Sequence, residues 1–120
     1  MGEVVAVVGA SNDRRKFGNK AVRAFVRQGF DVKPIHPTET TVEGLRVYPT
    51  VAAVGVPIDR VTMYVPPEVG LTLIDDIAAC QPGEIWLNPG ADSPALVARS
   101  RALGYEPVLA CSIVAIGERP

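Results

Sequence analysis

The sequence predicts an α/β protein: a single doubly wound, Rossmann-like domain with about five parallel strands and helices on both faces. Short apolar runs rich in β-branched residues alternate along the chain with segments of helical periodicity. The first run, residues 4–8, is apolar throughout, as in a strand of a parallel sheet that is covered on both sides. The 120 residues suffice for one domain with its own core, spanning positions 1–120.

The expected strands cover residues 4–8, 31–35, 61–65, 84–87 and 106–110. The first strand ends at Gly9 and the second at the loop of residues 36–40. Because strands and helices alternate, each crossover should be right-handed and the strands parallel.

Three helices are expected between or after these strands. The first begins near Gly18, ends before Gly29, and should bury Ala21, Val22, Phe25 and Val26. The second opens at Pro66-Pro67-Glu68, with a buried stripe of Leu71, Ile74, Ile77 and Ala78. The third has Ser93 as N-cap and ends at Gly104. Residues 50–56 also admit a short helix, and the last nine residues have no clear assignment.

Composition excludes several classes of function. The net charge of −1 gives no overall basic field for nucleic acid or an anionic membrane. One histidine and the well-separated Cys80 and Cys111 predict neither a metal site nor a disulfide framework. Since no apolar run approaches the roughly 20 residues of a membrane-spanning helix, a cytoplasmic protein is expected. A homo-oligomer or a protein partner remains open.

The loop between the first strand and the first helix is the most informative segment. Gly9 directly after a buried strand lets a phosphate approach the backbone, and the next helix N-terminus offers free N–H groups. Ser11 and Asn12 add short polar side chains, and residues 14–16, Arg-Arg-Lys, add three positive charges. A solvated surface loop is the simpler interpretation, but its place in the fold favours phosphate binding.

The common nucleotide fingerprints are absent from this loop. A GxGxxG motif would need glycine at Ser11 and Arg14, and a P-loop would also need glycine at position 14. The acid expected for an NAD ribose is also missing, because Asp31 lies at the start of the second strand rather than at its end.

Four segments, GASNDRRKFGNKAV, VKPIHP, MYVPPE and IWLNPGA, together resemble the stand-alone CoA-binding proteins. These are similar to the N-terminal domain of the succinyl-CoA synthetase α subunit. The resemblance covers residues 4–111 and implies a Rossmann-like domain that binds coenzyme A or an acyl-CoA. His36 departs from the family pattern, in which many members have asparagine, and Asn88 stands where many relatives have glutamine.

The resemblance also implies which residues contact the ligand. The phosphate segment would be the first loop, the adenosine would lie at the end of the second strand, and the remaining loops would line the pyrophosphate and pantetheine. The expected cofactor-binding residues, with Arg14 and Cys111 added from their positions, are Gly9, Ala10, Ser11, Asn12, Arg14, Lys16, Gly18, Ile35, His36, Pro37, Tyr64, Val65, Pro66, Pro67, Leu87, Asn88, Gly90 and Cys111.

Several of these residues have structural interpretations that stay open. Tyr64 and the neighbouring Trp86 lie on expected strands, where aromatic residues usually belong to the core. Pro66 and Pro67 could simply start a helix, His36 could be an ordinary loop residue, and Cys111 could be core filling.

No catalytic constellation is visible, so no catalytic residue is predicted. His36, Glu68 and Cys111 lie on different loops, without a second residue placed by sequence to activate any of them. The leading hypothesis is a non-catalytic CoA sensor, carrier or regulatory module. The alternatives are an NAD(P)-binding regulator or dehydrogenase remnant, and a protein-interaction subunit with a relic nucleotide site.

Overall fold

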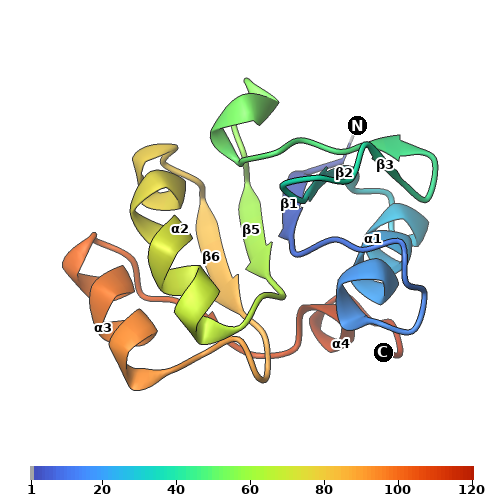
Figure 1. Cartoon of the computed structure of the whole chain (residues 1–120). Helices are drawn as coiled ribbons and strands as arrows, with labels where there is room; N and C mark the ends of the chain where they lie inside the picture. Colours follow the sequence, from blue (N-terminus) through green and yellow to red (C-terminus); the bar gives the residue numbers. More distant parts are fainter. Residues whose placement is uncertain (1) are drawn as a thin grey trace.

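The computed structural model describes residues 2–120 and confirms the predicted fold class (Figure 1). A parallel sheet contains β1 (Val4–Val8), β2 (Asp31–Ile35), β5 (Arg60–Met63), β6 (Glu84–Leu87) and β7 (Val108–Leu109). Their order across the sheet is β2-β1-β5-β6-β7. The strand order therefore reverses between β1 and β5, and the carboxyl ends of these two strands flank the crevice where such folds bind ligands.

Helices cover both faces of this sheet (Figure 1). The helices α1 (Phe17–Arg27) and α4 (Ser112–Ala115) pack on one face, and α2 (Pro67–Ala79) and α3 (Pro94–Ala102) on the other. Alternate residues of β1 separate the two cores, because Val5 and Val7 face α1 while Ala6 and Val8 face α2. No helix within residues 2–120 has the length and apolarity to cross a membrane.

The connection from β2 to β5 contains a hairpin that the sequence did not predict and a short helix within residues 50–56, where the sequence admitted one. A hairpin of β3 (Thr41–Val42) and β4 (Leu45–Arg46) is followed by the short 3-10 helix η1 (Ala52–Val54). Between them, Tyr48 forms a parallel bridge with Ile35 and extends the sheet beyond β2. Val42 packs on the α1 side and Val54 on the α2 side, so this connection crosses from one face to the other.

Three helix positions and two strand ends differ from expectation. Ala78 of α2, expected in the buried stripe, is half-buried. Val26 is 48% exposed, because the contact face of α1 is centred on Ala21, Val22 and Phe25. Leu71 is 39% exposed, because Gly70 takes the buried position on α2 and lets the Leu96 side chain approach closely.

The strand expected over 61–65 runs instead from Arg60 to Met63, and the following proline pair turns the chain into α2. The strand expected over 106–110 is reduced to Val108–Leu109, because Pro107 has no N–H for the sheet. The unassigned tail contains α4, and Glu118 binds Arg27 and Gln28 of the α1 end.

Candidate functional site

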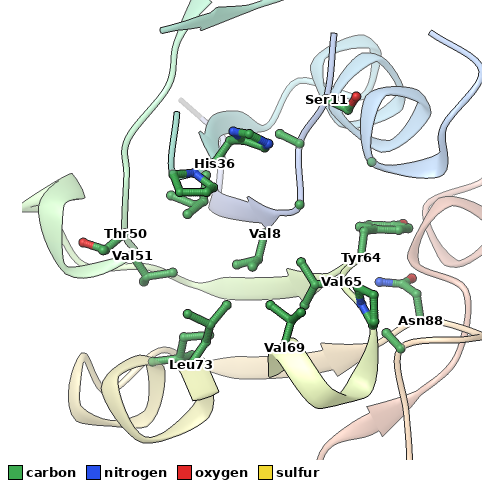
Figure 2. Close-up of a pocket in the computed structure, with 18 of the residues that line it drawn as sticks. Val8, Ser11, His36, Thr50, Val51, Tyr64, Val65, Val69, Leu73 and Asn88 are labelled. Atoms are coloured by element: carbon green, nitrogen blue, oxygen red, sulfur yellow. The ribbon is translucent and has the colours of Figure 1, made fainter. Parts of the chain in front are cut away.

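A cavity of about 1060 Å³ opens above the carboxyl ends of the strands. Figure 2 shows His36 and Ser11 on one side of this cavity and Val69 and Leu73 of α2 on the opposite side. Thr50 and Val51 lie toward one end, and Tyr64 and Asn88 toward the other (Figure 2). The cavity therefore spans both halves of the doubly wound sheet.

Two glycines determine how closely α1 approaches β1. Gly9 has φ of 90°, and a Cβ at this position would lie 2.8 Å from the carbonyl oxygen of Tyr64. A Cβ at Gly18 would lie 2.1 Å from the Gly9 carbonyl oxygen. Both positions therefore require glycine, and together they bring the first turn of α1 directly against the end of β1.

The first turn of α1 carries free backbone donors. Lys16 is the N-cap residue and its side chain caps nothing, and the first turn contains no acid. Within residues 2–120, no acceptor bonds the amides of Phe17 or Gly18, which both line the cavity. These amides and the helix dipole make this end of α1 a site for an anion.

Other backbone amides near the cavity are less available. The Gly9 and Ala10 amides both donate to the Ile35 carbonyl, at 3.1 and 3.2 Å. The helix α2 also begins at the cavity, but Pro67 has no N–H and Glu68 adds a negative charge to its first turn. An anion therefore finds its donors at α1 rather than at α2.

Of the three basic residues in the loop, Lys16 is the one available to a ligand. The Nε atom of Arg14 lies 3.5 Å from the Glu43 carboxylate, outside the cavity lining. Arg15 binds Asp13 at 3.1 Å, and this pairing lowers the pKa of the Asp13 carboxyl to about 2. Lys16 lines the cavity and forms no ion pair within residues 2–120.

The β3–β4 hairpin and Glu39 just before it are hydrogen-bonded to the β1–α1 loop and to α1. Asn12 donates to Glu39 and to the carbonyl of Thr41, both at 2.9 Å. The buried Asn19 donates to the Ser11 carbonyl at 2.8 Å and to Glu43 at 3.2 Å. Both of the Asn12 bonds come from its side-chain amide, so Asn12 stabilises the loop and its donors are not available to a ligand. The loop conformation is therefore fixed without a ligand.

At the end of β2, His36 is held by the turn that follows it. Its Nδ1 atom accepts hydrogen bonds from the amides of Thr38 and Glu39, both at 3.1 Å. The His36 amide donates to the Tyr48 carbonyl at 3.0 Å, which brings residues 49–52 to the cavity rim.

A buried polar network lies at the ends of β5 and β6. The Asn88 side chain donates to Thr62 at 2.7 Å and to the Met63 carbonyl at 2.9 Å, and accepts from the Ser112 amide at 2.8 Å. Thr62 and Ser112 share a further hydrogen bond of 2.7 Å. Asn88 lines the cavity, but its side chain is engaged in joining β5, β6 and α4.

Tyr64 lies beside this network, and its buried hydroxyl has no hydrogen-bond partner within residues 2–120. Burial raises the pKa of the Tyr64 hydroxyl well above its ordinary value. The phenol therefore stays protonated at neutral pH and is unsuited to act as a general base.

The opposite wall of the cavity, on α2, is mostly apolar and was not predicted from the sequence. Asp76 is the one acid among the described residues that line the cavity. Val69, Leu73 and Ile77 of α2 line this wall, and Val51 lines the cavity at the Leu73 end (Figure 2). Phe17 lines the cavity at the β1–α1 loop. Phe17 is 55% exposed and Val69 42% exposed, so a ligand has apolar surface to cover. The spacing of Val69, Leu73 and Ile77 at every fourth residue was the available signal for a second face of α2.

The cavity brings together most of the residues expected to bind a ligand. Those that line it are Gly9, Ala10, Ser11, Lys16, Gly18, Ile35, His36, Pro37, Tyr64, Val65, Pro66, Asn88 and Gly90.

Five expected residues lie outside the lining: Asn12, Arg14, Pro67, Leu87 and Cys111. Leu87 is buried in the α2 core, and Cys111 is the half-buried N-cap residue of α4. Trp86 also lies elsewhere, with the Arg60 guanidinium 4.7 Å from its ring centre. Cys80 at the end of α2, by contrast, does line the cavity.

The doubly wound sheet, the crevice at its reversal point and the uncapped helix N-terminus define a nucleotide-binding domain of Rossmann type. The sequence matches the model of the CoA binding domain family over residues 3–117, and the chain belongs to that family. A comparison with curated proteins gave no match.

Solved structures share the fold over nearly the whole chain. A conserved hypothetical protein from Pyrococcus furiosus is 27% identical, with a TM-score of 0.86, and the match covers 96% of this chain and 99% of that one. A Thermus thermophilus protein is 23% identical, with a TM-score of 0.86 and coverage of 94% and 87%.

A larger protein contains a similar domain. Acetyl-coenzyme A synthetase 1 from Ca. Korarchaeum cryptofilum, in complex with phosphate and ADP, is 30% identical with a TM-score of 0.76. The match covers 88% of this chain but 25% of the synthetase. The shared part is therefore one domain of a much longer chain.

Proposed function

We propose that this protein binds coenzyme A or an acyl-CoA in the cavity and acts as a non-catalytic sensor, carrier or regulatory module. The observation that carries the proposal is the first turn of α1, where Lys16 and the free amides of Phe17 and Gly18 face an apolar-walled cavity. Family membership makes CoA the first choice among ligands that combine phosphates with a long, mostly uncharged arm.

The chemistry of the cavity suggests how CoA would lie. Its diphosphate would accept hydrogen bonds at the first turn of α1. The adenine would occupy the end of the cavity that Val51 and Leu73 line. The pantetheine would run past Val69 and Pro66 toward Gly90. This orientation places each part of the ligand against groups of matching polarity.

The hydrogen bonds and protonation of the polar residues in the cavity support binding without catalysis. The Nδ1 atom of His36 is used by two backbone amides, and the Asn88 side chain is committed to the β5–β6–α4 network. Burial keeps the Tyr64 phenol protonated. A general base or nucleophile next to the pantetheine end would need a free, activated group, and these residues do not offer one.

Titration calorimetry with CoA, acetyl-CoA, NAD and NADP tests the proposal. We expect micromolar or tighter binding of CoA, and much weaker binding of NAD, because no carboxylate at the end of β2 is placed for the NAD ribose. Equal or tighter binding of NAD or NADP would support the dinucleotide alternative, and no binding of any of the four would support the interaction subunit.

A second measurement addresses the absence of catalysis. Acetyl-CoA incubated with the protein should release free CoA thiol no faster than acetyl-CoA in buffer alone. Release that increases with protein concentration, and that is lost in Lys16→Ala, would contradict the non-catalytic role.

A further inference from the structure

The hydrogen bonds of His36 fix which of its ring nitrogens can meet a ligand. Two backbone amides, those of Thr38 and Glu39, donate to Nδ1 at 3.1 Å. An atom that accepts N–H donors carries no proton itself, so the proton of the neutral ring is on Nε2. His36 lines the cavity, and Nε2–H is its remaining hydrogen-bonding group.

The position of this donor, just after β2, is the position beside which such folds bind the ribose of a nucleotide. In doubly wound nucleotide-binding folds, the end of the second strand lies beside the ribose that follows the helix-bound diphosphate. A carboxylate there accepts from ribose hydroxyls, whereas a donor or cation suits a phosphate on the ribose. β2 ends at Ile35, and the next residue is His36, a donor.

The acidic side chains nearby leave a donor, not an acceptor, at the end of β2. Asp76, the one acid among the described residues that line the cavity, lies on α2 rather than beside His36. Asp31 lies at the opposite end of β2, where it pairs with Lys33 at 3.2 Å. The Glu39 carboxylate follows in the turn, but it accepts from the Asn12 amide at 2.9 Å and so is held toward the loop. Lys16, the N-cap residue of α1, adds a positive charge to the same cavity.

We propose that His36 is a specificity-determining residue that donates its Nε2–H to the phosphate on the ligand's ribose, so that the site selects 3′-phosphorylated CoA over dephospho-CoA. The inference rests on the proposed CoA binding and deepens it. A hydrogen bond to a charged phosphate is stronger than one to a hydroxyl, which gives the selectivity its physical basis.

Substitution by asparagine separates the two roles of His36. The Asn side-chain oxygen can accept from amides two and three residues ahead, as Nδ1 does here, and so keeps the turn. Asparagine is too short to place a donor where Nε2–H is. His36→Asp would keep the same turn and add a negative charge beside the ribose phosphate.

The experiment compares the Kd of CoA and of dephospho-CoA by calorimetry. Wild type should prefer CoA by about tenfold or more, the scale of one charge-assisted hydrogen bond. His36→Asn should reduce the preference to about threefold or less, and His36→Asp should abolish or reverse it. The readout in each variant is the ratio of the two Kd values, because loss of the ribose-phosphate contact lowers the affinity for CoA more than the affinity for dephospho-CoA.

Lys16→Ala is the matched control, because its target, the diphosphate, is common to both ligands. It should weaken both by a similar factor and leave their ratio unchanged. Equal CoA preference in wild type and His36→Asn, with CoA still bound, would overturn the role of His36 and leave the proposed function intact. Wild type that binds neither ligand would overturn both.

Discussion

Lys16 illustrates how a local ion-pair pattern separates residues that look equivalent in the sequence. The run Arg14-Arg15-Lys16 appears to offer three equal cations, yet Arg14 pairs with Glu43 and Arg15 with Asp13. Lys16 alone of the three lines the cavity. We therefore expect Lys16, the residue before the helix, to supply the charge that a bound phosphate meets.

The first prediction concerns these three cations. Lys16→Ala should weaken CoA binding by about 1–2 kcal/mol, because one charge-assisted hydrogen bond to phosphate is lost. Arg14→Ala and Arg15→Ala should each cost less than about 0.5 kcal/mol, as expected for exposed, already paired charges. Calorimetry at two salt concentrations measures this, with a smaller salt dependence expected for Lys16→Ala. Equal losses in all three variants would mean that the loop acts only through its total charge.

The two cysteines provide a second test at the residue scale. Cys80 lines the cavity at the end of α2, whereas Cys111 lies outside the lining at the start of α4. Bound CoA should therefore slow alkylation of Cys80 by iodoacetamide and leave Cys111 unaffected. Peptide mass spectrometry after timed labelling, with and without CoA, reads both sites in one sample.

The opposite protection pattern would redirect the pantetheine toward Cys111. A mixed disulfide between Cys111 and oxidised CoA, abolished by Cys111→Ser, would have the same meaning. The expected result for wild type is no such adduct at Cys111, because the half-buried sulfur lies outside the cavity lining.

Among the elements, β5, β6 and α4 are joined by the buried side-chain network around Asn88. Asn88→Ala would leave the Thr62 hydroxyl and the Ser112 amide each without one partner in the core. We expect a loss of about 3 kcal/mol in the free energy of unfolding, since each buried group left unsatisfied costs about 1–3 kcal/mol. Urea denaturation measures it, with the exposed Asn12→Ala as the matched control, expected to lose less than about 1 kcal/mol.

The elements also show which features of the fold the sequence could predict. Ser93 was expected as the N-cap of α3, and its hydroxyl accepts from the Leu96 amide at 3.1 Å. Such a cap depends on residues within one turn, so local sequence predicts it. The bounds of β1, β2 and β6 were also predicted from local sequence. β1 is a wholly apolar run, and β2 and β6 are short segments between turn residues.

The β3–β4 hairpin escaped prediction because its turn has an unusual residue. Glu43 has φ of 49° and Gly44 φ of 77°, a pair of positive values that usually calls for Asn-Gly or Asp-Gly. The wall of the cavity at residues 49–52 was missed for a different reason. Its position follows from the pairing of Tyr48 with β2, a tertiary contact without a local sequence signal.

At the scale of the whole molecule, the cavity lies across the point where the sheet changes direction. One half contributes the β1–α1 loop and the end of β2, and the other contributes α2 and the loop after β6. A ligand that fills the cavity contacts both halves and therefore binds the folded chain but not the unfolded one. Binding and folding should be coupled by mass action.

The last prediction follows from this coupling. CoA at about 100 times its Kd should raise the free energy of unfolding by about 2.7 kcal/mol. The urea midpoint should rise with an unchanged slope, because the same surface is exposed on unfolding. Hydrogen exchange should slow both at the first turn of α1, including Phe17 and Gly18, and at Val69 in α2, which contact different parts of the ligand. NAD at the same concentration is the control, and protection confined to α1 would mean that only the phosphates are bound and that α2 is not part of the site.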